Sequence, residues 1–240
     1  MGIKHKIGKV IIPRLPVSRL TFDLLRHELN AIRNRLGWNL LPHRIIRKRR
    51  LRKLRGVYVN LGSGGWLLPG FLHLDLYGGA AEVIRWDCCA GLPFGDGSAR
   101  GIRVEHFVEH VEPRQHLPRL LAECYRVLEV GGTLRIVVPD AERFLKAYAD
   151  GSPDAFAPLG FPPPFPSDLP TRMDLVNHVF HQWHEHRWGY DFETLEHRLR
   201  AAGFETVLKR NFGESDDPML RTDREQHKPY SLYVDAVRQA

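Results

Sequence analysis

The chain has 240 residues, enough for one α/β domain with a buried core and a shorter extension. Its hydrophobic content of 43% and charged content of 26% indicate a soluble globular protein. No apolar run approaches the roughly 20 residues of a membrane-spanning helix, and the N-terminus lacks the apolar core of a signal peptide. Three cysteines without metal-type spacing fit free thiols in a reducing compartment, so the cytoplasm is the expected location.

The net charge of +7 is distributed unevenly along the chain. Residues 1–55 hold 16 Lys and Arg against two acidic residues, a net charge of +14, whereas residues 56–240 hold 19 against 26, a net charge of −7. The sequence therefore predicts a basic N-terminal extension over 1–55 and a separate α/β domain over 56–240.

An apolar stripe with helical spacing runs through the extension, and a basic cluster follows it over 44–55. The stripe consists of Leu20, Leu24, Leu25, Leu29, Ile32, Leu36 and Leu40. Such a helix can lie on an anionic membrane surface, at the inner face of the membrane, where each cation adds about 1 kcal/mol. The same residues can instead bind nucleic acid, or pack the stripe on the domain with the charges in solvent. Nucleic acid is the least favoured partner because no aromatic residues interleave the charges.

The stretch from Val57 to Asp75 predicts a strand, a glycine turn and a second strand. An apolar run stops at residues 62–65, Gly-Ser-Gly-Gly, and a second short run ends on Asp75. Glycines after a buried strand let the backbone approach a ligand that a side chain would exclude. A carboxylate at the end of the next strand can accept hydrogen bonds from both hydroxyls of a ribose. The pattern suggests half of a nucleoside site, although the same glycine cluster also occurs in ordinary loops.

Alternating strands and helices follow. We expect strands over 82–85, 101–106 and 133–138, a helix over 117–128 that is ended by Gly131 and Gly132, a helix from Asp191 to about Ala202, and final strands over 205–209 and 230–236. Strands joined by crossovers predict a doubly wound, mainly parallel α/β sheet whose ligands bind beyond the carboxyl ends of the strands. The link between Leu61 and Phe71 is too short for a full helix.

Five segments in order resemble class I S-adenosylmethionine-dependent methyltransferases, most closely small bacterial proteins of that class found among genes for surface-glycan synthesis. The segments are 60–64, Asp75, 87–94, 106–110 and 123–134. The resemblance covers about 56–146 and resumes near the C-terminus. It implies a seven-stranded Rossmann-like sheet with an antiparallel last strand.

The resemblance also implies a site for S-adenosyl-L-methionine. The turn 62–64 would lie against its methionine portion and sugar, Asp75 would hold the ribose hydroxyls, and Asp87 would accept the adenine amino group with Cys88 beside the ring. His106 would face the sulfonium and the substrate. The expected cofactor set is Asn60, Gly62, Ser63, Gly64, Asp75, Leu76, Asp87, Cys88 and His106. Capping roles for the two aspartates, and a buried structural role for His106, are the alternatives.

Residues 150–190 form a long insertion, which we expect to be a substrate-side lid. Its first part is rich in proline and its second part, 178–190, in histidines and aromatic rings that suit the wall of a substrate pocket. The resemblance places His186 and Tyr190 near the pocket mouth. If the acceptor must lose a proton, His106 or His186 is the expected general base.

No metal ion is expected. His178, His181 and Glu185 could share one helical face, but their spacing is not a recognised zinc signature. Simple packing is the remaining interpretation of this segment.

The resemblance thus implies methyl transfer from S-adenosyl-L-methionine to a small molecule or glycan by direct in-line displacement. A non-catalytic nucleoside-binding protein of the same fold, and a nucleic-acid methyltransferase that uses the basic extension, are the alternatives. The sequence gives no expectation for the oligomeric state.

Overall fold

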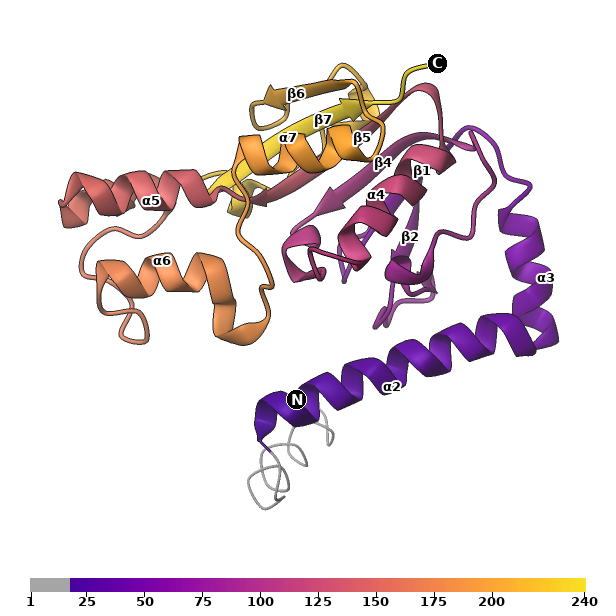
Figure 1. Cartoon of the computed structure of the whole chain (residues 1–240), viewed down its shortest axis with the longest axis horizontal. Coiled ribbons are helices and arrows are strands. Elements are labelled where there is room, and N and C mark those ends of the chain that lie inside the picture. Colours follow the sequence, from indigo (N-terminus) through magenta and orange to yellow (C-terminus); the bar gives the residue numbers. More distant parts are fainter. Residues whose placement is uncertain (1–17) are drawn as a thin grey trace.

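The computed structural model describes residues 18–240, and its centre is a seven-stranded sheet in the order β3-β2-β1-β4-β5-β7-β6 (Figure 1). The strands are β1 (Val57–Leu61), β2 (Phe71–Asp75), β3 (Val83–Arg85), β4 (Ala99–Glu105), β5 (Leu128–Pro139), β6 (Thr206–Arg210) and β7 (Ser231–Val237). The first five pair in parallel, and β7 lies antiparallel to both β5 and β6. The predicted α/β sheet with an antiparallel last strand is confirmed.

The helices are α2 (Arg19–Leu40), α3 (Pro42–Leu51), α4 (His116–Val127), α5 (Ala141–Asp150), α6 (Arg172–His181) and α7 (Phe192–Ala201). Ser18, Asp140 and Asp191 begin α2, α5 and α7, and each side chain accepts a backbone N–H of the first turn. The predicted helices over 18–40, 117–128 and 191–202 are confirmed within one or two residues at each end.

One face of the sheet is apolar and packs on α4 and α7, which lie in front of the strands in Figure 1. Alternate residues of β4 and β5, such as Ile102, Val104, Leu134 and Ile136, point to this face, as the two-residue period of a strand requires. Helix α4 packs against it with Leu117, Leu120, Leu121, Cys124 and Val127. The main core of the protein lies between these layers.

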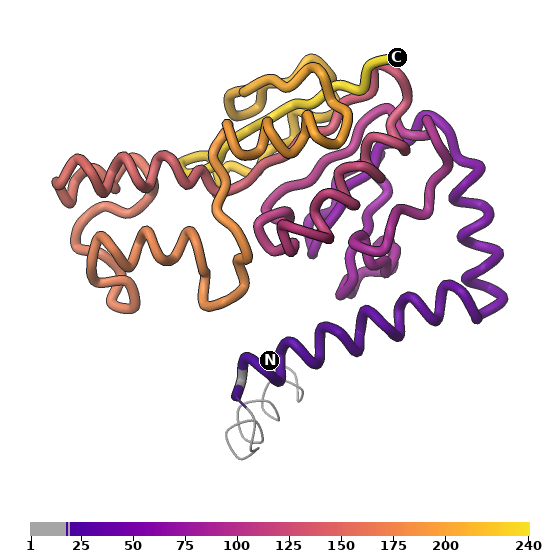
Figure 2. Tube along the Cα trace, in the orientation of Figure 1, coloured from indigo at the N-terminus to yellow at the C-terminus, as the bar shows by residue number. Residues whose placement is uncertain are grey.

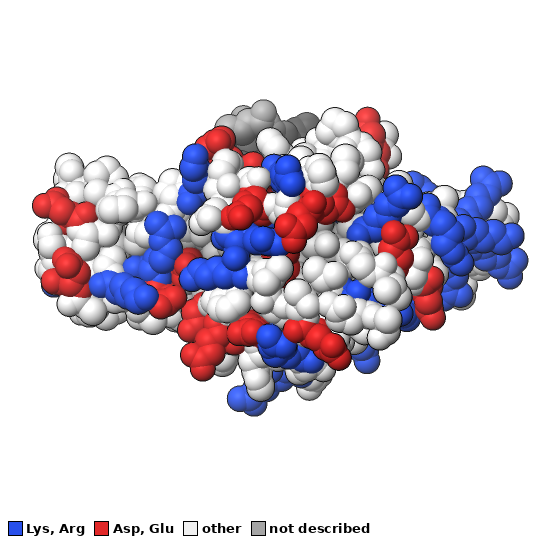
Figure 3. Space-filling view, turned by 90° about the horizontal axis from the view of Figure 1, so that it is seen from above, with Lys and Arg blue, Asp and Glu red and all other residues white. Residues whose placement is uncertain are grey.

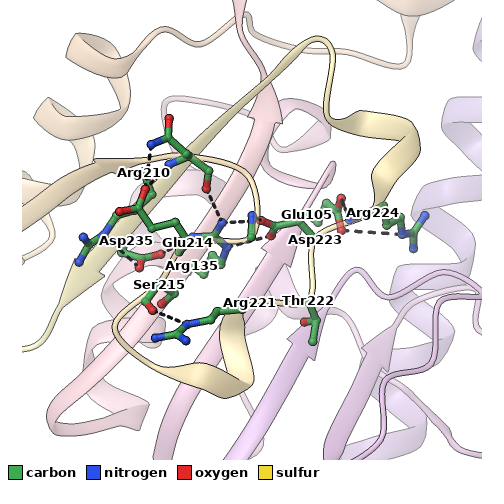
Figure 4. A network of polar contacts seen from close by, with 12 residues as sticks. Glu105, Arg135, Arg210, Glu214, Ser215, Arg221, Thr222, Asp223, Arg224 and Asp235 are labelled. Carbon is green, nitrogen blue, oxygen red and sulfur yellow. Dashed lines mark hydrogen bonds and ion pairs between the residues drawn. The ribbon is translucent and has the colours of Figure 1, made fainter.

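The opposite face carries charged side chains under the loop 211–230 (Figure 4). Arg135 of β5 is fully buried, and its guanidinium contacts Asp223 at 2.5 Å and Asp235 at 2.8 Å. On β4, Arg103 pairs with Glu105, and Glu105 also accepts from the His227 ring at 2.8 Å. Burial alone would lower the pKa of Arg135, but the adjoining aspartates raise it above its usual value. These ion pairs hold the loop 211–230 on the sheet.

The boundary between α4 and β5 differs from the sequence prediction. Helix α4 ends at Val127 and β5 begins at Leu128, so Gly131 and Gly132 lie inside a strand instead of ending a helix. The register with β4 shifts here, from Ala99 opposite Leu128 to Gly101 opposite Thr133. A Cβ at Gly132 would lie 2.9 Å from the Glu129 carbonyl oxygen, which explains the glycine.

Two of the recognised sequence segments, 87–94 and 123–134, contact each other directly. Glu123 of α4 accepts the Leu92 N–H at 2.7 Å and pairs with Arg126, and Arg126 donates to the Phe94 carbonyl. The Arg126 guanidinium holds the pKa of the Glu123 carboxyl below its usual range, against the effect of partial burial. The pair therefore fixes the loop that follows Asp87.

This depressed pKa predicts an acid-dependent loss of stability. Above the pKa of a carboxyl in the unfolded chain the stabilisation by Glu123 is complete, and it disappears as the pH falls through the lower folded-state value. We expect Glu123→Gln to lower the free energy of unfolding by about 1 to 2 kcal/mol at pH 7, and the difference from wild type to shrink as the pH falls below the usual range of a carboxyl pKa. Urea titrations at pH 7, 5 and 3 measure this. Glu225→Gln is the control, because Glu225 forms only an exposed pair with Lys228; a Glu123→Gln effect that did not change with pH would contradict the assignment.

The predicted insertion, 150–190, builds a small second core together with α5. Phe144 and Ala147 of α5 pack with Phe156, Leu159 and α6 residues such as Leu175. Figure 2 shows this lobe beside the sheet, at the opposite end of the molecule from α3. The insertion is therefore ordered structure with its own apolar contacts, and its role as a lid stays a prediction.

Helix α2 packs on the domain with the face opposite its apolar stripe. The packed residues are Ala31, Asn34 and Trp38, and the ring of Trp38 meets Trp86 at 4.8 Å between centroids. At about 100° of rotation per residue these three lie on the far side of the helix from Leu29, Ile32 and Leu36, which are 46–53% exposed. The expectation that the stripe packs on the domain is wrong, because polar and aromatic residues make that contact.

Within residues 18–240, none of the helices combines the length and apolar character needed to cross a bilayer.

Candidate active site

The predicted cofactor turn follows β1 and depends on glycine in two ways. Gly62 has φ +62°, and a Cβ there would lie 2.5 Å from the Phe107 ring, so only glycine fits. Gly64 has φ +52°, and a Cβ there would have no atom within 4 Å. The first glycine therefore permits close packing against the end of β4, while the second leaves the turn open on its outer side.

Ser63 and Asp75 give this turn unused acceptor capacity. The Ser63 hydroxyl is buried and has no hydrogen-bond partner within residues 18–240. The Asp75 carboxylate accepts the Gly64 N–H at 3.0 Å and the Tyr77 N–H at 2.7 Å, one on each oxygen, so each oxygen keeps a lone pair. Leu76, half-buried, follows directly. An orphaned hydroxyl beside a carboxylate fits the sugar and amino-acid portions of S-adenosyl-L-methionine.

Asp87 is buried after β3 and is shared with the N-terminal helix. Its carboxylate accepts the Cys89 N–H at 3.0 Å and the Arg35 Nε–H of α2 at 2.6 Å, while its own N–H donates to Asn34. The side chain thus caps the turn 88–90, which is the capping role given above as the alternative to adenine binding, and it also anchors α2. The neighbouring Cys88 thiol lies in the main core, where burial raises its pKa well above the usual value.

The short link between β1 and β2 contains no helix and is supported by polar side chains. No helix forms over 62–70, as predicted. Asn60 of the predicted cofactor set is buried, and its amide donates to the Trp66 carbonyl at 3.2 Å. His73 Nε2 lies 3.2 Å from both the Leu68 N–H and the Leu68 carbonyl. The Arg224 guanidinium lies over the Trp66 ring, 4.8 Å from its centroid. Asn60 therefore supports the link from within.

His106 lies just past β4 in a left-handed backbone conformation, φ +49°, which costs a non-glycine residue about 1 kcal/mol or more. Its Nε2 is 2.9 Å from the Ser231 hydroxyl and its Nδ1 is 3.3 Å from the Glu109 carboxylate. The His227 and Tyr230 rings pack against it at centroid distances of 3.9 and 5.7 Å. The ring is therefore packed against two other rings, with the Ser231 hydroxyl at one nitrogen and the Glu109 carboxylate facing the other.

Ser231, His227 and Tyr230 were not predicted as site residues. They come from the end of the loop 211–230 and the start of β7, more than 120 residues after His106. A signal in the sequence is the presence of Arg103 and Glu105 in a buried strand, because such charged residues need buried partners from elsewhere.

Glu109 and His110 meet the end of the insertion. His110 Nδ1 bonds the Glu185 carbonyl at 3.0 Å, and the Arg187 N–H donates to the Glu109 carbonyl at 2.7 Å. The His186 ring packs edge-on to the His110 ring at 4.8 Å. Burial raises the pKa of Glu109, but His106 and His110 outweigh it and hold the pKa of the carboxyl below its usual range.

The structure brings together His106, Glu109 and His186 at the carboxyl end of β4, next to the turn 62–64. Tyr190, in contrast, is 1% exposed and belongs to the main core, not to an open pocket mouth. The notional metal set of His178, His181 and Glu185 does not share a helical face, because α6 ends at His181 and residues 182–184 are left-handed.

A hollow of about 450 Å³ lies away from these residues, between α3 and the segment 90–96. Lys48, Arg52, Trp86 and Glu123 line it, and none of its lining residues belongs to the predicted cofactor set. This hollow is therefore separate from the candidate site, which consists of side chains at the carboxyl ends of the strands.

Comparison with known proteins matches residues 74–136 to the family model described as "Methyltransferase domain". No curated protein matches the chain. Similar solved structures include an S-adenosylmethionine-dependent methyltransferase from Archaeoglobus fulgidus (18% identity, TM-score 0.46, 88% of this chain and 99% of that one) and a possible histamine N-methyltransferase from Thermotoga maritima (18%, 0.47, 90% and 96%). A methyltransferase from Mesorhizobium loti is 20% identical, with a TM-score of 0.45 over 84% and 100% of the chains. At these identities and TM-scores the likeness carries no inference about substrate.

The matched domain begins at the end of β2 and runs through β5, so it includes Asp75, Asp87 and His106. It lies in the sheet whose order and antiparallel last strand were expected of this class. Residues 74–136 are thus similar to a methyltransferase domain, and the whole sheet has the strand order expected of S-adenosylmethionine-dependent methyltransferases.

Proposed function

We propose that the protein transfers a methyl group to a hydroxyl oxygen of a small-molecule or glycan acceptor. A glycan, or its lipid- or nucleotide-linked precursor, is the acceptor we favour. The supporting observation is the pair formed by His106 and Glu109, with 3.3 Å between Nδ1 and the carboxylate. A carboxylate that orients an imidazole makes the other ring nitrogen a general base. A hydroxyl acceptor needs such a base because it must lose its proton, whereas a neutral amine can attack unaided.

The predicted cofactor residues and this pair follow the carboxyl ends of four neighbouring strands, β3, β2, β1 and β4. When bound, S-adenosyl-L-methionine supplies an electrophilic methyl group. Gly62, Ser63 and Asp75 would hold it, while His106 Nε2 would take the proton of the acceptor hydroxyl after leaving the Ser231 hydroxyl. Glu109 would stabilise the imidazolium that forms. The aromatic and histidine-rich segment 185–190 would cover the acceptor.

Calorimetry and turnover together test this function. The full chain is expected to bind S-adenosyl-L-methionine and S-adenosyl-L-homocysteine; a folded protein that bound neither would be a non-catalytic relative. Release of S-adenosyl-L-homocysteine is then measured with free sugars, nucleotide sugars, polyprenyl-linked sugars and RNA. We expect turnover with a sugar-containing acceptor, and loss of about 10² to 10⁴ in kcat for His106→Gln with cofactor binding retained. Turnover with RNA alone would replace the glycan proposal by the nucleic-acid alternative.

We also propose that α2 and α3 attach the enzyme to an anionic membrane surface. The exposed apolar face of α2 comprises Leu25, Leu29, Ile32, Leu36 and Leu40, each 46–67% exposed. Arg26 and Arg33 flank it along the helix, and α3 adds Arg44, Arg47, Lys48, Arg49 and Arg50. In Figure 3 the Lys and Arg side chains gather at the right-hand end of the molecule, where α3 lies. An apolar face flanked by cations is typical of helices that lie in the headgroup region of acidic lipids.

Vesicle sedimentation is the test of membrane attachment. The wild type is expected to sediment with vesicles of phosphatidylglycerol and phosphatidylcholine, and not with phosphatidylcholine alone. A variant with Leu29→Gln, Ile32→Gln and Leu36→Gln should lose at least about tenfold in vesicle affinity, because each leucine-sized side chain contributes about 1 kcal/mol or more when buried in lipid. Point substitutions are preferred to deletion of 1–55, since the other face of α2 contacts Asp87.

The matched control replaces two exposed apolar residues elsewhere, Val130→Gln and Leu145→Gln. This variant is expected to sediment like the wild type. Equal sedimentation of the α2 variant and the wild type would contradict membrane attachment through α2.

A further inference from the structure

Three side chains near His106 form a compact group of metal-ligating atoms. Glu109, His110 and His186 each place one ligand atom within 4.8 Å of the others. They come from the turn after β4, Val108–His110, and from the end of the insertion. Two imidazoles and one carboxylate are the donor set of many catalytic zinc and iron sites.

The carboxylate of this group has no hydrogen-bond partner that accounts for its burial. Glu109 is 1% exposed, and neither of its oxygens makes a hydrogen bond within the described residues. One oxygen lies 3.3 Å from His106 Nδ1, which it orients, and the other oxygen has no polar partner among the described residues. A buried carboxylate normally has several donors or a metal ion around it, because desolvation of the charge is costly.

Both histidines have the tautomer that a metal ligand needs. His110 Nδ1 is 3.0 Å from the Glu185 carbonyl, and His186 Nδ1 is 2.7 Å from the Val179 carbonyl. A carbonyl only accepts, so each Nδ1 carries the proton and each Nε2 keeps its lone pair. A ligating histidine almost always donates its second nitrogen to a carbonyl or carboxylate in this way. The remaining free donors are the two Nε2 atoms and the Glu109 oxygens.

We infer that Glu109, His110 and His186 bind a divalent transition-metal ion of the zinc class. Two imidazole ligands favour such an ion over Mg²⁺ or Ca²⁺, which prefer oxygen donors. A tetrahedral ion with bonds of about 2.0 to 2.1 Å needs donors about 3.4 Å apart. One ligand atom of each residue already lies within 4.8 Å of the others, so the three side chains need to close by roughly an ångström to reach this spacing.

Three protein ligands leave coordination positions open for water or for an oxygen of the acceptor. This second role rests on the proposed function, because it assumes an acceptor hydroxyl beside His106. There the ion would lower the pKa of the hydroxyl, and His106 would take the released proton, so that charge and protons balance. Ion binding itself does not depend on which acceptor is methylated.

Calorimetry with Zn²⁺ alone, on full-length protein stripped of metal by a chelator, tests the site at pH 7.5. One ion per chain is expected to bind the wild type. Glu109→Gln and His186→Gln should each weaken this binding by at least about tenfold to hundredfold. Glutamine keeps the size of each side chain approximately, and circular dichroism melts establish that both variants are folded; His110→Gln serves if either is not.

The matched control is the double variant His181→Gln and His184→Gln, which removes two exposed histidines from the same segment. It is expected to bind Zn²⁺ as the wild type does. Absence of zinc binding in the wild type would overturn the inference and leave the group a cluster of ion pairs. Equal loss in the control and in the cluster variants would do so too, because it would mean unspecific binding by histidines. Zinc binding without any methyl transfer would leave this inference standing and remove only the proposed function.

Discussion

Arg135→Met is expected to lower the free energy of unfolding by about 3 to 5 kcal/mol, because it leaves buried carboxylates without their cation. Arg135 is 0% exposed and bonds both Asp223 and Asp235, and it also donates to the Glu214 carbonyl. Methionine fills much of the same volume, so the loss reports mainly the uncompensated charges. In a chain of 240 residues this corresponds to a fall in Tm of about 10 °C, measurable by calorimetry.

Arg200→Met is the matched control, because Arg200 is 52% exposed, and it pairs with Glu196 along α7 and donates to the Glu205 carbonyl. A change below about 0.5 kcal/mol is expected there. If the two variants melted within a few degrees of each other, the buried network would not be what holds the loop 211–230 on the sheet. Loss of His106 positioning should accompany the Arg135 variant, since His227, Tyr230 and Ser231 end this loop.

Asp75→Ala is expected to weaken binding of S-adenosyl-L-methionine by about 10² to 10⁴. Each hydrogen bond from a ribose hydroxyl to a carboxylate contributes about 1.5 to 3 kcal/mol, and the variant removes both. It also releases the Gly64 N–H, which fixes the turn beside the ligand. Asp75→Asn keeps one acceptor oxygen in place and should lose only about tenfold. Calorimetry with S-adenosyl-L-homocysteine measures all three proteins.

Asp168→Ala is the control for this series, because Asp168 is exposed on the insertion. Its affinity is expected to equal that of the wild type. A wild-type affinity for Asp75→Ala, in a protein that melts normally, would mean that the carboxylate serves only the turns at Gly64 and Tyr77.

The sheet could be predicted from the sequence because each buried strand is recognisable from its own residues and their immediate neighbours. Val57–Leu61 and Phe71–Asp75 are short apolar runs bounded by glycine or an acid, and the structure places them as β1 and β2. The absence of a helix between them followed from the length of the link alone. The start of β5 was missed because Gly131 and Gly132, which usually mark an end, here allow a shift of register beside β4.

The charged face and half of the site could not be predicted, because their contacts join distant parts of the chain. Arg135 bonds Asp223 and Asp235, which lie 88 and 100 residues later in the chain. His106 bonds Ser231, which lies 125 residues later. No spacing rule relates such positions. The histidine-rich segment was recognised as important, but the grouping of His186 with Glu109 depends on a chain reversal at 182–184 that sequence periodicity does not contain.

Helix α2 would connect the proposed membrane surface with the proposed cofactor site, because its two faces belong to one helix. Its inner face contacts Asp87 through Arg35 and Asn34, while Leu29, Ile32 and Leu36 face outward. If lipid contact changes how firmly α2 lies on Asp87, the affinity for the adenine end of the cofactor changes by some factor, and occupancy of that site changes the affinity for lipid by the same factor. The enzyme would then be loaded with methyl donor to a different extent on the membrane and in solution, without a second domain to sense either state.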